Sequence, residues 1–277
     1  MMSLLDKLLD LANKNNSIRA LVMNGSRVNP NITPDEYQDY DIVFYVNNYQ
    51  GFIKDFSFID TLGEVLVKQT SLDQRDGLET INESFTYMVQ YKDGSRIDLT
   101  IRDIKYVLED FKSDSLSMVL LDKEGLGLDN NPNESSYYVK KITKEDFTFT
   151  VNEFYWVCPY IAKGIKRRQL FYAMKHLDII RHELENMIDW WIGDNHNFEV
   201  SVGKGKSRYK DLLSQGIYRQ YVLTYPKLSR IEITKALKIA INLFDLLASE
   251  LAKTYNFIYD NTIKENILLF FKTNYDL

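Results

Sequence analysis

Cysteine is almost absent from this chain of 277 residues, which contains Cys158 alone. A single cysteine excludes an intramolecular disulfide and is typical of proteins that work in a reducing compartment. Cys158 stands between Val157 and Pro159, close to Trp156, so we expect a small buried side chain there and not a catalytic nucleophile.

Long apolar runs are lacking too. No segment reaches the roughly 18 uninterrupted apolar residues that a membrane-spanning helix needs. The N-terminal segment places Asp6, Lys7 and Asp10 among leucines, a pattern typical of an amphipathic helix and not of a secretion signal. We therefore expect a soluble cytoplasmic protein with no membrane partner.

Basic residues are fewer than acidic ones: 34 Lys and Arg against 39 Asp and Glu give a net charge of −5. The imbalance is uneven: residues 1–150 carry −9 (16 basic against 25 acidic residues) and residues 151–277 carry +4 (18 against 14). An acidic protein is poorly suited to bind along nucleic acid and better suited to a cationic small substrate. The basic second half could supply phosphate contacts.

The chain does contain ample material for a core, with 45% hydrophobic residues. Residues 1–140 alternate short β-rich runs with helical patterns, which predicts an α+β domain with a mixed sheet. The predicted strands cover 18–24, 40–46, 64–69, 85–91, 96–101 and 118–121, and the predicted helices cover 2–15, 50–60 and 104–111.

Polar residues 126–136 are predicted to link this domain to a second one, residues 141–277. There the apolar period becomes helical, which predicts an all-helical bundle. Thr143 is placed to cap the first helix. The predicted helices cover 144–161, 166–192, 208–223, 231–254 and 258–272.

The most informative stretch runs from residue 18 to residue 46. An apolar run ends in Gly25-Ser26. After twelve intervening residues, Asp39 and Asp41 flank a tyrosine at the front of a second apolar run. Alternate side chains of a strand share a face, so the two carboxylates project together, about 7 Å apart. They repel each other unless a cation neutralises them, and a Gly-Ser turn can bring N–H groups to phosphate oxygens. Metal with polyphosphate indicates nucleotidyl or phosphoryl transfer.

A third carboxylate lies in the second arm of the predicted hairpin. Asp98 stands between Ile97 and Leu99, where a charge is costly to bury unless it is paired or bound to a metal. It either faces solvent in an alternating strand or joins Asp39 and Asp41. In the second case it completes a metal site or accepts the proton of an attacking hydroxyl.

These motifs resemble the DNA polymerase β-like nucleotidyltransferase superfamily. The likeness narrows to the aminoglycoside 6-adenylyltransferases (streptomycin adenylyltransferases) through the segments MNGSRVNPNITPDEYQDYDI, RIDLTI, LLDKEG, YIAKGI and SVGKGKSRYK, and it covers nearly the whole chain. The resemblance implies a polymerase β-like catalytic domain followed by a helical domain. It also implies transfer of AMP from ATP to a streptomycin hydroxyl, with Mg²⁺ as cofactor and release of pyrophosphate, the chemistry of antibiotic resistance.

The resemblance also implies roles for individual residues. Asp39 and Asp41 become magnesium ligands, and Asp98 becomes the general base or a further ligand. Gly25 and Ser26 would contact the triphosphate.

Two cations complete the implied nucleotide site. Arg27 would offer a guanidinium fork to phosphate oxygens. Lys204 would reach the phosphates from the helical domain; the alternative for it is an ordinary solvated lysine.

One position departs from the family pattern. Where that pattern has an acidic residue before a helical histidine, this chain has Lys175 before His176. Lys175 would repel a guanidino-bearing antibiotic, whereas Asp178, on a similar face, could bind one. Three alternatives stay open: another small acceptor, such as a different aminoglycoside or a lincosamide; modification of a protein or an RNA end; and an inactive nucleotide-binding protein.

Overall fold

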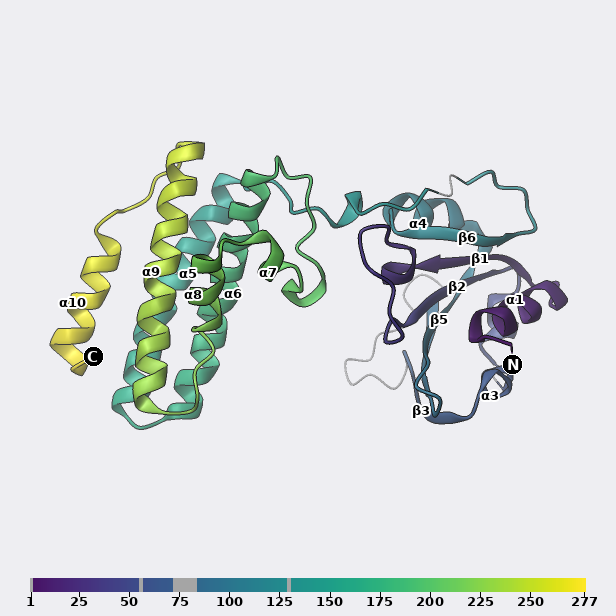
Figure 1. Cartoon of the computed structure of the whole chain (residues 1–277), viewed down its shortest axis with the longest axis horizontal. Helices are drawn as coiled ribbons and strands as arrows, with labels where there is room; N and C mark the ends of the chain where they lie inside the picture. Colours follow the sequence, from purple (N-terminus) through teal and green to yellow (C-terminus); the bar gives the residue numbers. More distant parts are fainter. Residues whose placement is uncertain (1, 55–56, 72–83, 129–130) are drawn as a thin grey trace. The chain divides into compact units, whose positions relative to one another are not determined.

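The computed structural model describes residues 2–54, 57–71, 84–128 and 131–277. Contacts divide the chain into two units, Met1–Ser136 and Tyr137–Leu277 (Figure 1). The boundary predicted from the sequence fell after residue 140. Residues 129 and 130 of the predicted linker, and 55 and 56 of the predicted helix 50–60, lie outside the described residues.

The first unit is built on a six-stranded mixed sheet of order β3-β4-β5-β2-β1-β6. β2 and β5 run parallel, and the other neighbouring pairs run antiparallel. The predicted α+β class is confirmed. The strands are β1 (Ile18–Asn24), β2 (Tyr40–Val46), β3 (Val65–Thr70), β4 (Ser84–Tyr91), β5 (Arg96–Asp103) and β6 (Ser117–Asp122). The helices are α1 (Leu4–Lys14), α2 (Tyr49–Phe52), α3 (Phe58–Leu62) and α4 (Val107–Ser113).

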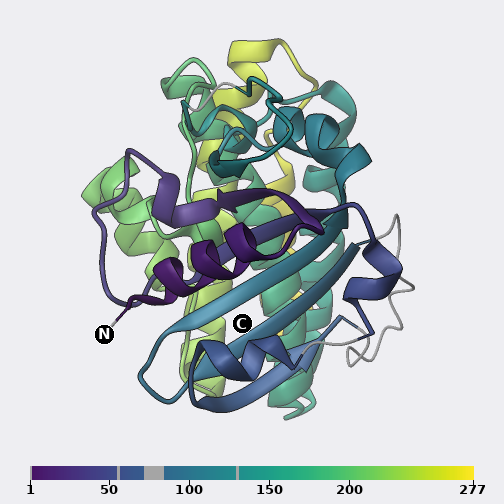
Figure 2. The same ribbon diagram turned by 90° about the vertical axis from the view of Figure 1, so that its right-hand side faces the viewer.

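The two faces of the sheet differ in what covers them. Residues of β4 and β5 alternate between buried and half-buried, the pattern of a sheet packed mainly on one side. The buried side carries the main core, including Phe44, Tyr87 and Leu99, and packs against α1, α2 and α3. Figure 2 shows α1 and α3 lying across this face. On the other side a smaller apolar cluster around Tyr45 packs against α4.

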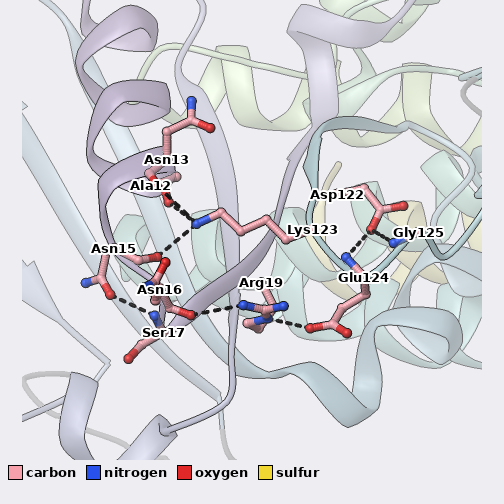
Figure 3. Close-up of polar contacts among 10 residues, drawn as sticks. All are labelled: Ala12, Asn13, Asn15, Asn16, Ser17, Arg19, Asp122, Lys123, Glu124 and Gly125. Atoms are coloured by element: carbon pink, nitrogen blue, oxygen red, sulfur yellow. Dashed lines mark hydrogen bonds and ion pairs between the residues drawn. The ribbon is translucent and has the colours of Figure 1, made fainter.

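The turn after β6 fastens α1 to the sheet (Figure 3). The carboxylate of Asp122 accepts hydrogen bonds from the backbone N–H groups of residues 124–126 at 2.7–2.9 Å. Lys123 donates to three backbone carbonyl oxygens of residues 12–15 at 2.7–3.3 Å. These carbonyl oxygens lie at the C-terminal end of α1, where no further helical turn supplies N–H donors. The ammonium group of Lys123 takes the place of those donors and complements the helix dipole. The LLDKEG segment therefore has a structural role.

We expect Lys123→Met to lower the free energy of unfolding by about 1.5–3 kcal/mol, the range for hydrogen bonds of a charged group. Methionine keeps the length of the side chain but not its donors. Denaturant titration followed by circular dichroism measures the loss. The control, Arg19→Met, removes the nearby ion pair with Glu124 and should cost less than about 1 kcal/mol. A Lys123→Met protein as stable as the wild type would contradict this role.

The second unit is helical, as predicted. Its core forms largely between three long helices, α5 (Lys144–Lys166), α6 (Leu170–Asn195) and α9 (Arg230–Tyr255). The shorter helices are α7 (Tyr209–Leu212), α8 (Gln215–Val222) and α10 (Ile263–Tyr275). Thr143 caps α5 as predicted, because its hydroxyl oxygen accepts a hydrogen bond from the N–H of Asp146 at 3.0 Å.

Some helix boundaries differ from the predicted ones. The predicted helix 208–223 is two helices, because Leu213 is extended and the Ser214 hydroxyl caps α8. α5 continues beyond the predicted end at residue 161, since buried Ala162 and Ile165 extend its apolar face. α10 begins at Ile263 and not at residue 258.

Cys158 and the helices can now be compared with two expectations from the sequence. Cys158 is fully buried, and burial raises the pKa of its thiol, which suits a packing role and not a nucleophile. No helix in the described part of the chain combines the length and the apolar character needed to cross a membrane.

Candidate active site

The predicted acids meet at one end of three neighbouring strands, β1, β2 and β5. Asp41 is the register partner of Asn24 on β1 and of Asp98 on the parallel strand β5. Register partners on adjacent strands project to the same face of a sheet. Asp41 and Asp98 therefore lie together, on the face opposite the main core.

Arg96 joins the third carboxylate to this pair. Its guanidinium donates to the two carboxylate oxygens of Asp98 at 3.1 and 2.9 Å, and its Nη1 lies 3.5 Å from Oδ2 of Asp39. The hydrogen bonds to Asp98, with the charges of Asp98, Asp39 and Asp41, raise the pKa of Arg96. The structure thus gathers all three predicted aspartates around one cation.

The chemistry of these groups suits a hard divalent cation. Three carboxylates offer only oxygen ligands, which Mg²⁺ prefers, and the arginine among them shows that the cluster attracts positive charge. The side chains of Asp39 and Asp98 are 38% and 27% exposed, so ions in solution can reach them. Within the described residues, no group of three or more His, Cys, Asp or Glu side chains is already spaced to hold a metal. Metal binding would need the pairing between Arg96 and these carboxylates to change.

Gly25 opens the turn after β1, η1 (Gly25–Val28), and lies directly against Asp41. Its φ of +77° falls in the left-handed region. A Cβ at this position would stand 2.4 Å from Oδ2 of Asp41, far inside the contact distance. Glycine is therefore required both by the backbone conformation and by the close approach. The Gly-Ser turn and the acids, separate in the sequence, form one site.

The next two residues of the turn have different surroundings. Ser26 is half-buried, and no hydrogen bond from its hydroxyl is found among the described residues, which leaves the group available to a phosphate. Arg27 donates to the carbonyl oxygens of Gln38 and Asp39 at 2.6 and 3.0 Å, and its guanidinium lies 3.7 Å from the ring centroid of Tyr40. Arg27 thus holds in place the backbone segment that carries Asp39. Its contact with phosphate stays a prediction.

A buried acid anchors the loop beyond this turn. Glu134 is 6% exposed and accepts hydrogen bonds from the side-chain amides of Asn29 and Asn31 at 2.7 and 2.9 Å. Asn29 and Asn31, which closely follow Gly25 and Ser26 in the segment MNGSRVNPNITPDEYQDYDI, therefore hold the turn in place. Their partner, Glu134, lies more than a hundred residues further along the chain, so the local sequence could not predict this contact.

Sequence reasoning missed two residues of the site. Arg96 precedes Asp98 by two positions, so the strand period alone could have placed both on one face. Asn24 donates through Nδ2 to Asp114 at 3.4 Å, and its buried Oδ1 has no hydrogen-bond partner among the residues described. A buried oxygen without a donor, beside the row of acids, is a further potential ligand atom.

The two candidates of the second unit are exposed. Lys204 opens the short turn η4 (Lys204–Lys206). Asp178, on α6, forms an ion pair with the buried Arg181, while its own side chain is 62% exposed. Their roles in binding nucleotide and acceptor stay predictions.

Comparison with known proteins finds matches over nearly the whole chain. A model of the streptomycin adenylyltransferase family matches residues 1–274. An aminoglycoside 6-adenylyltransferase of Staphylococcus aureus is 30% identical over 99% of this chain and 98% of its own. One of Campylobacter jejuni is 31% identical over 95% of this chain and 93% of its own. A crystal structure of an aminoglycoside 6-adenyltransferase from Bacillus subtilis is 25% identical, with a TM-score of 0.48 and coverage of 99% of this chain and 98% of that one.

Proposed function

Because the chain belongs to the streptomycin adenylyltransferase family, we propose that it transfers AMP from ATP to a hydroxyl of an aminoglycoside and releases pyrophosphate. The observation that carries this proposal is the cluster of Asp39, Asp41 and Asp98 packed against the turn at Gly25. Oxygen ligands for a divalent cation, next to a glycine turn that can approach phosphates, are what nucleotidyl transfer requires.

In this reaction the acceptor oxygen bonds to the α-phosphorus of ATP, and the bond from that phosphorus to the pyrophosphate oxygen breaks. Asp98 accepts the proton of the attacking hydroxyl, an effect typically worth about 10²–10⁴-fold, or serves as a further metal ligand. Asp39 and Asp41 would hold Mg²⁺, which when bound offsets the negative charge of the phosphates. The backbone at Gly25 and the Ser26 hydroxyl orient the triphosphate for in-line attack.

The acceptor is proposed to be of the streptomycin type, modified at its 6-position, after the names of the relatives. One observation favours a different aminoglycoside. Lys175 is exposed on α6, and the carboxylate of Asp178 is already paired with Arg181. A guanidino-bearing antibiotic would meet a positive charge and a carboxylate that is partly neutralised.

The test is incubation with ATP, Mg²⁺ and a panel of streptomycin, other aminoglycosides and a lincosamide, followed by mass spectrometry of each acceptor. We expect one adenylyl group on an aminoglycoside, with one pyrophosphate released per transfer. Removing the metal with EDTA should lower the rate by at least about 10³-fold, and added Mg²⁺ should restore it. Transfer to no member of the panel, or an undiminished rate in EDTA, would reject the proposal.

A further inference from the structure

Arg96 holds the same carboxylate oxygens that a metal ion would use. Its Nε and Nη2 each donate to one oxygen of Asp98, so the fork occupies both of them. Its Nη1 faces Asp39. A bidentate guanidinium fork is stronger and more specific in geometry than a single neutral hydrogen bond.

A divalent cation cannot join this arrangement unchanged. The guanidinium and Mg²⁺ would lie within a few ångströms of each other on the same acid, and like charges at that distance repel strongly. Either the metal stays away from Asp98, or Arg96 moves.

The surroundings leave Arg96 room to move. Its side chain is 41% exposed, so it is not enclosed by the rest of the protein. It also borders a cavity of about 310 Å³ lined by Lys68, Gln69, Met88 and Gln90 of β3 and β4. The long side chain can therefore leave the carboxylates without disturbing the core on the opposite face.

We propose that Arg96 is an internal counter-ion that holds the acid cluster together when no metal is bound, and that Mg²⁺ binds in competition with it. This inference rests on the proposed function, which assigns Mg²⁺ to these acids. Arg96 is a positioning residue in this role: it limits repulsion among three carboxylates and raises the Mg²⁺ concentration needed to fill the site.

The experiment is thermal unfolding of the nucleotide-free protein at increasing MgCl₂, with no substrate present. Arg96→Gln should unfold at a lower temperature than the wild type without metal, because the carboxylates then repel one another. Its half-saturating Mg²⁺ concentration should be about tenfold lower, since the metal no longer displaces a cation. Arg96→Lys, which keeps the charge, should stay near the wild type.

The matched control is Arg102→Gln, on the same strand and face. Arg102 makes the same kind of fork, to Asp110, outside the acid cluster. Its loss should lower the unfolding temperature and leave the Mg²⁺ midpoint unchanged.

Two results would overturn the inference, and only the second would also reject the metal site of the proposed function. If Mg²⁺ stabilises the wild type but not Asp41→Asn, while Arg96→Gln keeps the wild-type midpoint, only the competition is wrong. If Mg²⁺ stabilises the wild type and Asp41→Asn equally or not at all, the metal site of the proposed function fails with it.

Discussion

Replacing Asp39 and Asp41 together with asparagine is expected to lower the rate of AMP transfer by at least about 10³-fold, since the loss of metal-based charge stabilisation is worth several kcal/mol. The fold should survive, because both side chains are partly exposed and the fork between Arg96 and Asp98 is kept. Removing two like charges should even relieve some repulsion. Steady-state release of pyrophosphate measures the rate, and circular dichroism monitors the fold.

The matched control for this pair is Asp10→Asn on α1. Asp10 lies on α1, outside the acid cluster, and forms an exposed ion pair with Lys14. Exposed pairs of this kind contribute little to stability. The Asp10→Asn variant should transfer AMP at the wild-type rate. A double variant that keeps a substantial part of the activity would remove the metal assignment from Asp39 and Asp41.

Gly25→Ala is expected to lower the rate by about 10²-fold or more, because a displacement of about 1 Å at a reacting centre can cost that much. The new Cβ would stand 2.4 Å from Oδ2 of Asp41, so either the carboxylate or the turn must shift. The left-handed backbone adds a strain of about 1–2 kcal/mol for any residue with a side chain. The rate at saturating substrate, compared with the unfolding temperature, separates the two effects.

Gly94→Ala is the matched control for strain. Gly94 also has a positive φ, +93°, in the turn between β4 and β5, but nothing lies within 4 Å of a Cβ built there. This variant should lose similar stability and keep its activity. If Gly25→Ala were as active as Gly94→Ala and the wild type, the contact between Gly25 and Asp41 would not matter for the reaction.

Much of the fold was predictable because its signals are local. The strand alternation of residues 85–101 and the polar turn within them predicted the β4–β5 hairpin, and the helical period beyond residue 143 predicted the second unit. The family and the enzyme class, both inferred from motifs spread along the chain, are confirmed by the comparisons.

What could not be predicted depends on partners distant in the chain. The sequence shows that Arg27 is a cation, but its acceptors are backbone carbonyls placed by the path of a loop. Lys123 finds its three acceptors more than a hundred residues away, at the end of α1. The pairing of Asp41 with Asp98 follows from two parallel strands becoming neighbours, which no local pattern specifies.

The proposed reaction depends most on the binding of Mg²⁺ by the three aspartates together with the nucleotide. Calorimetric titration with a non-hydrolysable ATP analogue, in Mg²⁺ and again in EDTA, tests it without any acceptor. We expect the wild type to bind the analogue at least about tenfold more tightly with Mg²⁺, and Asp41→Asn to abolish the difference. The same affinity in both solutions, or a metal effect that Asp41→Asn leaves intact, would contradict it.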